Sequence, residues 1–196
     1  KALMAILSNY AVNSLVTSTC EVAPSLFSND KAQAFNIAKK IEMASKFSKM
    51  DIFRATTHNK GIFNGIDAVV IATGNDWRAI EAGGHAYATK DGKYSGLTEW
   101  TFDEEKYVLK GSLTLPMPVA SVGGSIGLNP TVKAAFNILN NPDAKTLAGI
   151  IVSVGLAQNF AALKALVSTG IQKGHMKLQA RSLALFAGAE NEEVDI

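Results

Sequence analysis

The strongest constraint on the fold is an apolar stretch at residues 147–157, which reads LAGIIVSVGLA. It contains no charged residue and ends at Gln158 and Asn159. A membrane-spanning helix needs about 20 apolar residues, and this stretch is shorter. A helix that is apolar on every side has to be covered by other parts of the protein. We therefore predict a buried core helix, with Pro142 near its start and Gly170 near its end.

The rest of the chain alternates between helical and extended patterns, which predicts a mainly helical α+β fold. Residues 14–22, SLVTSTCEV, are rich in Val and Thr and predict a strand. Residues 98–117 predict two more strands, since Pro116 and Pro118 mark where pairing stops. Further helices are expected at residues 1–10 (the last turns only), 28–47 with Ser28 or Asn29 as cap, 75–88 with Asn75 or Asp76 as cap, 130–139 and 175–187.

Composition and charge exclude several classes of function. The 196 residues are 47% hydrophobic and 18% charged, which is typical of one large globular domain or one domain with an appendage. The net charge of +2 is spread along the chain without a basic block, so we expect neither a nucleic acid nor a membrane as partner. Cys20 is the only cysteine, which excludes an intrachain disulfide and favours a cytoplasmic location.

The glycine-rich segment at residues 123–127, GGSIG, precedes a predicted helix whose first turn holds Pro130. Such a loop can bind a phosphate through backbone N–H groups at the helix N-terminus. The segment does not match GxGxxG, and no Lys-Ser or Lys-Thr pair follows as in a P-loop. Tight packing between loop and helix is therefore the favoured interpretation, and phosphate binding is the alternative.

The three histidines, His58, His85 and His175, are not spaced as metal ligands, so we predict no metal site. His85 fits a helix surface or a packing position. His175 lies at a predicted helix start near Lys173 and Lys177, and nearby cations lower an imidazole pKa. It could still donate a proton to a basic leaving group, while an exposed terminal histidine is the structural alternative.

Lys60 and Asp76 flank an apolar segment at residues 65–74, which fits either a buried strand or a buried helix. The neighbours Asn59 and Gly61 make Lys60 untypical of a surface helix. A lysine near a carboxylate can stabilise a developing oxyanion, and the carboxylate can fix the position of the charge. An exposed lysine and a capping aspartate are the alternative, and the pattern alone favours that alternative.

These residues lie in a segment that resembles the active-site core of hydroxymethylglutaryl-coenzyme A reductases, in the class II form typical of bacteria. The segment is residues 54–88, RATTHNKGIFNGIDAVVIATGNDWRAIEAGGHAYA. The motifs ILSNYA at residues 6–11, LAQNFAALKAL at residues 156–166 and GIQKGHMKLQAR at residues 170–181 follow the order of that family. The resemblance spans nearly the whole chain, and it favours a buried helix at residues 65–74.

The resemblance implies that hydroxymethylglutaryl-coenzyme A is reduced to mevalonate and coenzyme A by two hydrides from NADPH or NADH. It implies a homodimer with a shared active site. Lys60 would stabilise the oxyanion, Asp76 would support Lys60 by hydrogen bonding, and His175 on a mobile flap would protonate the departing thiolate. The implied substrate-binding residues are Arg54, which would bind the terminal carboxylate, with Thr57, Asn64 and Gln158, and Asn9 would lie near the nicotinamide.

The resemblance also predicts how the chain divides into domains. Residues 1–10 would end the small cofactor-binding domain, residues 11–170 would form the C-terminal half of the large substrate-binding domain, and residues 171–196 would begin the helical flap. The ENVIG-like motif with the family's catalytic glutamate and the DAMGxN-like dinucleotide motif have no match here. We therefore expect a C-terminal fragment that is inactive by itself. The alternative is a non-catalytic module of the same fold that binds an acyl-coenzyme A or assembles dimers.

Overall fold

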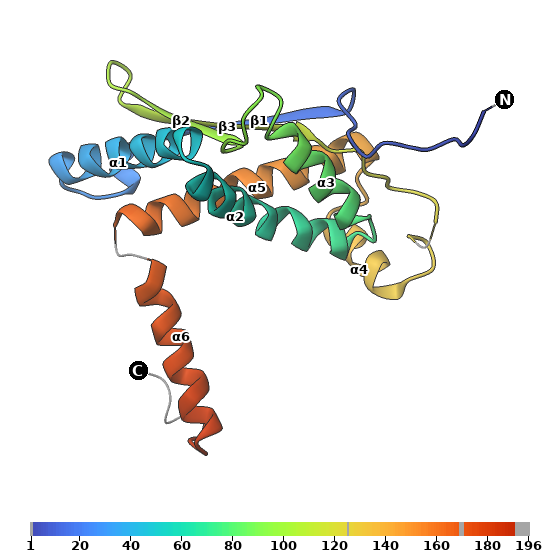
Figure 1. Cartoon of the computed structure of the whole chain (residues 1–196). Helices are drawn as coiled ribbons and strands as arrows, with labels where there is room; N and C mark the ends of the chain where they lie inside the picture. Colours follow the sequence, from blue (N-terminus) through green and yellow to red (C-terminus); the bar gives the residue numbers. More distant parts are fainter. Residues whose placement is uncertain (1, 125, 169–170, 191–196) are drawn as a thin grey trace.

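A computed structural model describes residues 2–124, 126–168 and 171–190, without the side chains of residues 171–175 and 177–178. In these ranges the chain is mainly helical with one antiparallel sheet, so the predicted α+β class is confirmed (Figure 1). The elements are β1 (Leu15–Val22), the short 3-10 helix η1 (Pro24–Leu26), α1 (Lys31–Met50), α2 (Ile52–Ala72), α3 (Trp77–Tyr87), β2 (Thr98–Asp103), β3 (Val108–Pro116), α4 (Pro130–Ile138), α5 (Ala144–Val167) and α6 (Ile171–Phe186).

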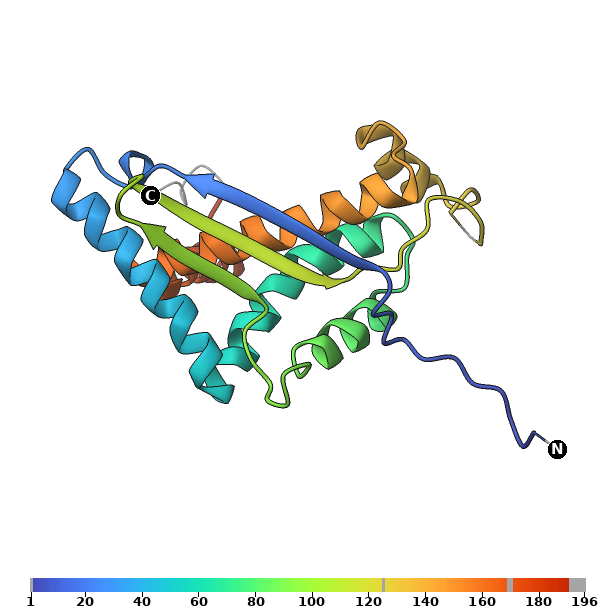
Figure 2. The same cartoon turned by 90° about the horizontal axis from the view of Figure 1, so that it is seen from above.

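The sheet has the strand order β1-β3-β2, and both outer strands run antiparallel to β3. Side chains alternate between its two faces, as expected for strands with one buried face. Leu109, Leu113 and Trp100 point into the core, while Thr17 and Glu99 on the outer face are exposed. Seen from above, α1 and α5 lie across one face of the sheet (Figure 2). The sheet therefore forms one layer of the domain and the helices form the other.

The apolar stretch forms the middle of α5, which packs between the sheet and α2. The predicted core helix is thus confirmed, although it begins after the capping Asp143 and ends at Val167, and Gly170 lies outside the described residues. With 24 residues, α5 is long and apolar enough to cross a membrane, so the expected shortfall in length is wrong. No other helix in the described ranges meets this criterion. A core helix can meet it equally well, and Ile151 and Leu163 of α5 are fully buried.

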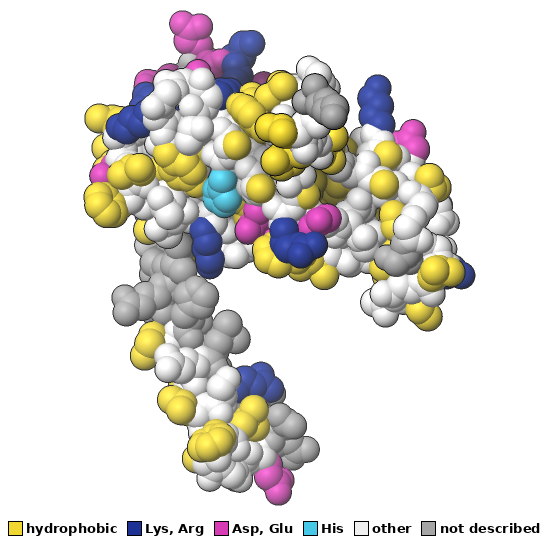
Figure 3. All heavy atoms as spheres, turned by 45° about the vertical axis from the view of Figure 1, so that its right-hand side comes forward, with side chains coloured by type: hydrophobic (Ala, Val, Ile, Leu, Met, Phe, Trp, Pro, Cys, Tyr) yellow, Lys and Arg dark blue, Asp and Glu magenta, His cyan; other side chains and the backbone are white. Residues whose placement is uncertain are grey.

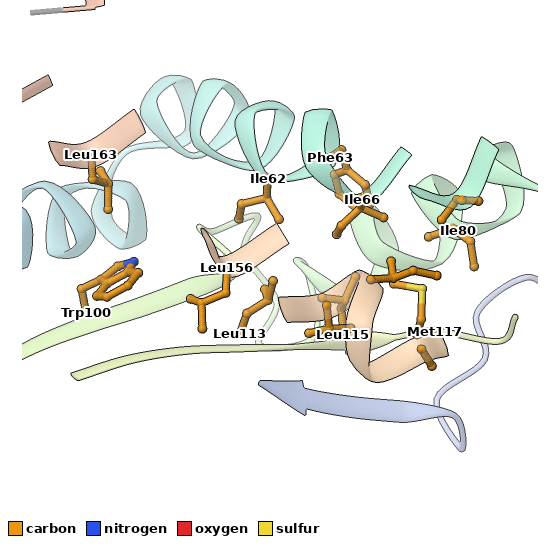
Figure 4. Packing of buried hydrophobic residues seen from close by; sticks show 14 of the residues in the cluster. Ile62, Phe63, Ile66, Ile80, Trp100, Leu113, Leu115, Met117, Leu156 and Leu163 are labelled. Carbon is orange, nitrogen blue, oxygen red and sulfur yellow. The ribbon is translucent and has the colours of Figure 1, made fainter. Parts of the chain in front are cut away.

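The ambiguous segment at residues 65–74 is helical, because it continues α2 to Ala72 before Gly74 turns the chain at φ 69°. Buried apolar side chains recur along α2 at the spacing of a helix, and Ile62 and Ile66 point toward Leu156 and Leu113 (Figure 4). Two glycines allow α2 and α5 to approach closely. A Cβ at Gly155 of α5 would lie 2.8 Å from Cγ1 of Ile66, and a Cβ at Gly65 of α2 would lie 2.9 Å from Cβ of Gln158.

Three local expectations need correction. Residues 2–10 form no helix, because Leu3 and Leu7 are exposed and a short helix without packed apolar side chains is marginal. Asp30 caps α1 in place of the expected Ser28 or Asn29, and its carboxylate accepts a hydrogen bond from the backbone nitrogen of Ala32 at 2.8 Å. Finally, α6 begins at Ile171, four residues earlier than expected.

Candidate active site

Four of the predicted site residues lie along one face of α2. Arg54, Thr57, Lys60 and Asn64 follow each other at intervals of three or four residues, which places them on neighbouring turns. Arg54 is half-buried and the other three are exposed. Lys60 is therefore a surface residue in the middle of a helix, contrary to the expectation drawn from its neighbours. The structure brings the predicted acyl-binding residues and the predicted oxyanion-stabilising lysine onto a single accessible strip.

Gln158 reaches this strip from α5. Its side chain lies against Gly65, where a larger residue would collide with the Cβ of Gln158 and with the carbonyl oxygen of Val154. Gln158 therefore contacts α2 at the residue that follows Asn64 in the sequence. Gly61 has the opposite surroundings, since among the described residues no atom outside the adjoining turns of α2 lies within 4 Å of the position that a Cβ would take. The backbone of α2 is thus open to a ligand next to Lys60.

The opposite side of α2 carries polar residues that the sequence did not mark as important. His58 is 1% exposed, and its Nε2 lies 2.5 Å from Oγ1 of Thr98 and 3.2 Å from Nδ2 of Asn159. Oδ1 of Asn159 also accepts a hydrogen bond from Nε1 of Trp100 at 2.9 Å. Burial, together with the charges of Arg54 and Lys49, lowers the pKa of His58 to about 3, so the ring is neutral.

Asn59 holds α2 against the segment that leads into β2. Its Nδ2 donates to the carbonyl oxygen of Ser95 at 3.0 Å, and its Oδ1 accepts from the backbone nitrogen of Leu97 at 2.9 Å. The side chains directly before Lys60 therefore lock the helix in place, which leaves Lys60 on the accessible side. Periodicity could have placed His58 and Asn59 on the buried face, but their partners lie 36 to 101 residues away in the chain.

Asp76 occupies a different place from Lys60. It caps α3, where its Oδ1 accepts hydrogen bonds from the backbone nitrogens of Arg78 at 3.1 Å and Ala79 at 3.4 Å. The Arg78 side chain and these bonds lower the pKa of its carboxyl group. Ala72, the end of α2, is twelve residues after Lys60, a separation of about 18 Å along a helix. Within this chain, Lys60 in the middle of α2 and Asp76 beyond the end of that helix are therefore separated.

A pair of carboxyl groups lies further along the same side of α2. Asp67 interacts with Glu81 of α3, and burial, followed by the hydrogen bond and the charge of Glu81, raises the pKa of Asp67 to about 7. Acidic and basic side chains also gather near one histidine on the body of the molecule beside α6 (Figure 3). Asp67 could not be identified from the sequence, because its partner is contributed by another helix.

His85 packs against α2 near this strip, in agreement with one of its two expected roles. Its ring centroid lies 4.9 Å from that of Phe63, and its Nδ1 lies 2.9 Å from the hydroxyl oxygen of Tyr94.

In the described ranges no group of three potential metal-ligating side chains occurs. The glycine-rich segment packs near the end of α2, where Ile126 and Val132 approach Gly74, while its Ser125 lies outside the described residues.

The remaining two predicted site residues lie at the ends of the chain. Asn9 is exposed, and its carbonyl oxygen would be 2.8 Å from a Cβ at Gly83, so the N-terminal segment packs tightly on α3. The backbone of His175 belongs to α6, which projects from the body (Figure 1), but its side chain lies outside the described residues. The structure thus assembles the strip on α2 with Gln158 and leaves Asn9, Asp76 and His175 apart from it.

Sequence comparison finds related proteins across the chain. The model of the family described as hydroxymethylglutaryl-coenzyme A reductase matches residues 1–180. The 3-hydroxy-3-methylglutaryl-coenzyme A reductase of Archaeoglobus fulgidus is 46% identical over 195 residues, which are 100% of this chain and 43% of that protein. The probable 3-hydroxy-3-methylglutaryl-coenzyme A reductase of Borreliella burgdorferi is 43% identical over 153 residues, or 78% of this chain and 35% of that protein.

Solved structures agree with the sequence comparison. The reductase from Streptococcus pneumoniae is similar with a TM-score of 0.84 and 65% identity over 98% of this chain and 46% of that chain. The class II reductase from the same organism, solved bound to NADPH in open conformations, has the same TM-score and identity. This chain spans less than half the length of each of these relatives. The expected resemblance to the class II form is thereby confirmed, and the chain belongs to the hydroxymethylglutaryl-coenzyme A reductase family.

Proposed function

We propose that this chain supplies the substrate-binding and oxyanion-stabilising part of a reductase that converts hydroxymethylglutaryl-coenzyme A to mevalonate in the mevalonate route to isoprenoids. One thioester, two NADPH (or NADH) and two protons give one primary alcohol, one free coenzyme A thiol and two oxidised nicotinamides. The observation that supports this proposal most directly is the accessible strip of α2, where Arg54, Thr57, Lys60 and Asn64 share one face beside Gln158.

The strip fits the chemistry of thioester reduction. The thioester carbonyl oxygen gains negative charge when hydride arrives, and the ammonium group of Lys60 stabilises that charge. Arg54 binds the carboxylate at the other end of the acyl group, since its planar fork suits two parallel hydrogen bonds. Asn64, Thr57 and Gln158 provide amide and hydroxyl groups for the acyl chain. The open backbone at Gly61 lets the reacting carbonyl approach the helix closely.

Further assignments follow from the family. NADPH, when bound, supplies the two hydrides, and Asn9 fits a place near the nicotinamide because it is exposed and its backbone is fixed on Gly83. His175 protonates the departing thiolate after residues 171–196 close over the site as a flap. We assign residues 1–10 to the end of a small cofactor domain and residues 11–170 to the large domain. We place the enzyme in the cytoplasm.

The separation of Lys60 from Asp76 supports a homodimer whose active site takes residues from both subunits. Asp76 caps α3 at a distance from Lys60 of the same subunit, and it is exposed, so it is accessible to a second copy. We propose that Asp76 of one subunit supports Lys60 of the other. A carboxylate next to the ammonium group would fix its position and keep it charged during the reaction.

Mixing two inactive variants tests this proposal in a polypeptide of full family length that carries this chain. Lys60→Ala and Asp76→Asn should each lower kcat at least about 100-fold, because an oxyanion-stabilising interaction is lost. Asparagine still caps a helix, so α3 should stay intact. Lys40→Ala, at an exposed lysine of α1, is the matched control and should keep wild-type activity.

A site shared between two subunits and a site within one subunit predict different outcomes of mixing. If Lys60 and Asp76 come from different subunits, a heterodimer of the two variants has one intact site, and random mixing should restore about a quarter of wild-type turnover. If they act within one subunit, every mixed site contains one substitution and turnover stays at background. Wild-type turnover by Lys60→Ala would instead overturn the reductase assignment itself.

A further inference from the structure

Two side-chain nitrogens on α2 are buried and have no hydrogen-bond partner among the described residues. They are Nε of Arg54 and Nδ1 of His58. The two residues are four positions apart in the helix, and helical side chains lean toward the N-terminal end, which directs His58 over the turn of Arg54. The charge of Arg54 is also one of the causes that lower the pKa of His58, as expected for close neighbours. Buried polar atoms are nearly always paired, so these two need an explanation.

The hydrogen bonds around His58 determine which of its nitrogens carries the proton. The indole nitrogen of Trp100 can only donate, so the atom of Asn159 that lies 2.9 Å from it must be the amide oxygen. This oxygen also accepts the hydroxyl proton of Thr98, whose Oγ1 lies 2.9 Å away. Oγ1 of Thr98 is then an acceptor towards Nε2 of His58, at 2.5 Å, and Nε2 carries the proton of the neutral ring. The longer contact of 3.2 Å between Nε2 and the amide nitrogen of Asn159 is therefore no hydrogen bond.

The two unpaired nitrogens are consequently complementary. Nδ1 of His58 has a lone pair and no proton, so it is an acceptor, whereas Nε of an arginine always carries a proton and is a donor. Both atoms are shielded from water, and they lie on neighbouring turns of one helix. Arg54 is half-buried, so the outer part of its side chain has room to turn. A rotation that brings Nε of Arg54 to Nδ1 of His58 satisfies both atoms at once.

We propose that His58 is a positioning residue, whose Nδ1 accepts a hydrogen bond from Nε of Arg54 while the guanidinium group binds the terminal carboxylate of the acyl substrate. His58 itself does not touch the substrate. The bond occupies Nε and leaves the two terminal nitrogens of Arg54 for two parallel hydrogen bonds to the carboxylate. The ring is held by Thr98 of β2, so the sheet fixes the direction of the arginine. This inference rests on the proposed function, because it deepens the role of Arg54 in that site.

Two substitutions of His58 separate its two nitrogens. His58→Gln keeps a donor near the position of Nε2, which faces Thr98, and removes the acceptor at Nδ1. His58→Asn keeps an amide oxygen near the position of Nδ1 and removes the contact with Thr98. Each variant is thus the matched control of the other. Steady-state kinetics are measured with both variants in a polypeptide of full family length, and thermal unfolding is measured alongside.

We expect His58→Gln to raise KM for hydroxymethylglutaryl-coenzyme A roughly 10-fold with kcat within about threefold of wild type, because the arginine is no longer held towards the carboxylate. His58→Asn should keep KM within about threefold of wild type, since the acceptor remains, and should lower the melting temperature instead. Equal KM for the two variants, or an unchanged KM in His58→Gln, would show that His58 is only structural.

A double-mutant cycle tests whether His58 acts through Arg54. Arg54→Ala should raise KM if the proposed function holds, and adding His58→Gln to that variant should change KM by less than about twofold. Separate effects that multiply in the double variant would overturn the inference. A higher KM in Arg54→Ala without one in His58→Gln rejects the inference alone, whereas an unchanged KM in both variants rejects the proposed function as well.

Histidine-selective 15N NMR of the wild type does not depend on how well the variants fold. In the free protein, Nε2 of His58 should carry the proton and Nδ1 should carry none. The signal of Nδ1 should shift when hydroxymethylglutaryl-coenzyme A is added, because Nε of Arg54 then donates to it. A proton on Nδ1, or a signal of Nδ1 that saturating substrate leaves unchanged, would overturn the inference.

Discussion

The two sides of α2 carry polar residues of opposite character. On the buried side, His58 and Asn59 bond to side chains and backbone groups that come from β2, α5 and the segment before β2. On the accessible side, Lys60 and Asn64 are exposed, and Gly61 leaves the backbone uncovered. The first set holds the helix in place, and the second is available for a ligand. Substitutions on the two sides should therefore act on different measurable quantities.

The strongest test of the buried side is its response to acid. The pKa of His58 is about 3 in the folded protein and lies near its model value of 6.5 in the unfolded chain. Below pH 6.5 His58 binds a proton in the unfolded state but not in the folded state, so the free energy of unfolding decreases as the pH falls. The loss should be about 1.4 kcal/mol per pH unit, or about 2 kcal/mol at pH 5, and larger towards pH 3.

Urea unfolding of the wild type and His58→Gln between pH 4 and pH 8 measures this effect. The variant has no imidazole at this position, so its stability should depend less steeply on pH below 6.5. Parallel curves for the two proteins would mean that His58 is charged or accessible in the folded state.

A pair of substitutions two residues apart should separate stability from activity. Ile66→Ala removes a fully buried side chain between α5 and the sheet, and should lower the free energy of unfolding by about 2–5 kcal/mol. Asn64→Ala on the accessible side should change it by less than about 0.5 kcal/mol and raise KM for the thioester substrate. Denaturation and kinetics on both variants provide the check. A large loss of stability in Asn64→Ala would mean that the accessible strip also supports the fold.

The carboxyl pair should produce a pH dependence of the opposite sign. The folded pKa of Asp67 is raised to about 7 from 3.8, so the stabilising contribution of its protonated form is present below pH 3.8 and is lost as the pH rises through 7. Asp67→Asn cannot ionise and should be more stable than the wild type at pH 8. Because the site is partly exposed to solvent, we expect a gain of about 1–2 kcal/mol. An equal stability of the two proteins at pH 8 would exclude a shared proton.

The smallest gain in stability is expected from a substitution at Gly61. Gly61→Ala adds a methyl group that no described residue outside the adjoining turns of α2 approaches within 4 Å, and alanine favours a helix over glycine by up to about 1 kcal/mol. The variant should therefore melt slightly higher, while its KM should rise because the methyl group occupies space needed by the substrate. A protein that is both more stable and equally active would show that the substrate does not approach α2 at this point.

Some features of the fold and of the candidate site could be predicted from the sequence, and others could not. The cap of α3 is Asp76, one of the two predicted candidates, and Pro130 lies in the first turn of α4 as predicted, because each of these signals involves neighbours in sequence. The helix expected at residues 1–10 was wrong, since its apolar side chains remain uncovered in the described structure. The spacing of Arg54, Thr57, Lys60 and Asn64 could have indicated a common face once residues 65–74 were known to be helical.

The sequence by itself determined the apolar core helix, the α+β class, the start of α3 and the family, because periodicity and motifs are local properties of a chain. Only the tertiary structure decided that Gln158 lies against Gly65, that His58 is buried and neutral, and that Asp67 interacts with Glu81. It also placed Lys60 in the middle of α2 and Asp76 beyond the end of that helix. The physical reason is that burial, proton affinity and contact between helices depend on residues distant in sequence, whose approach is fixed by packing of the whole domain.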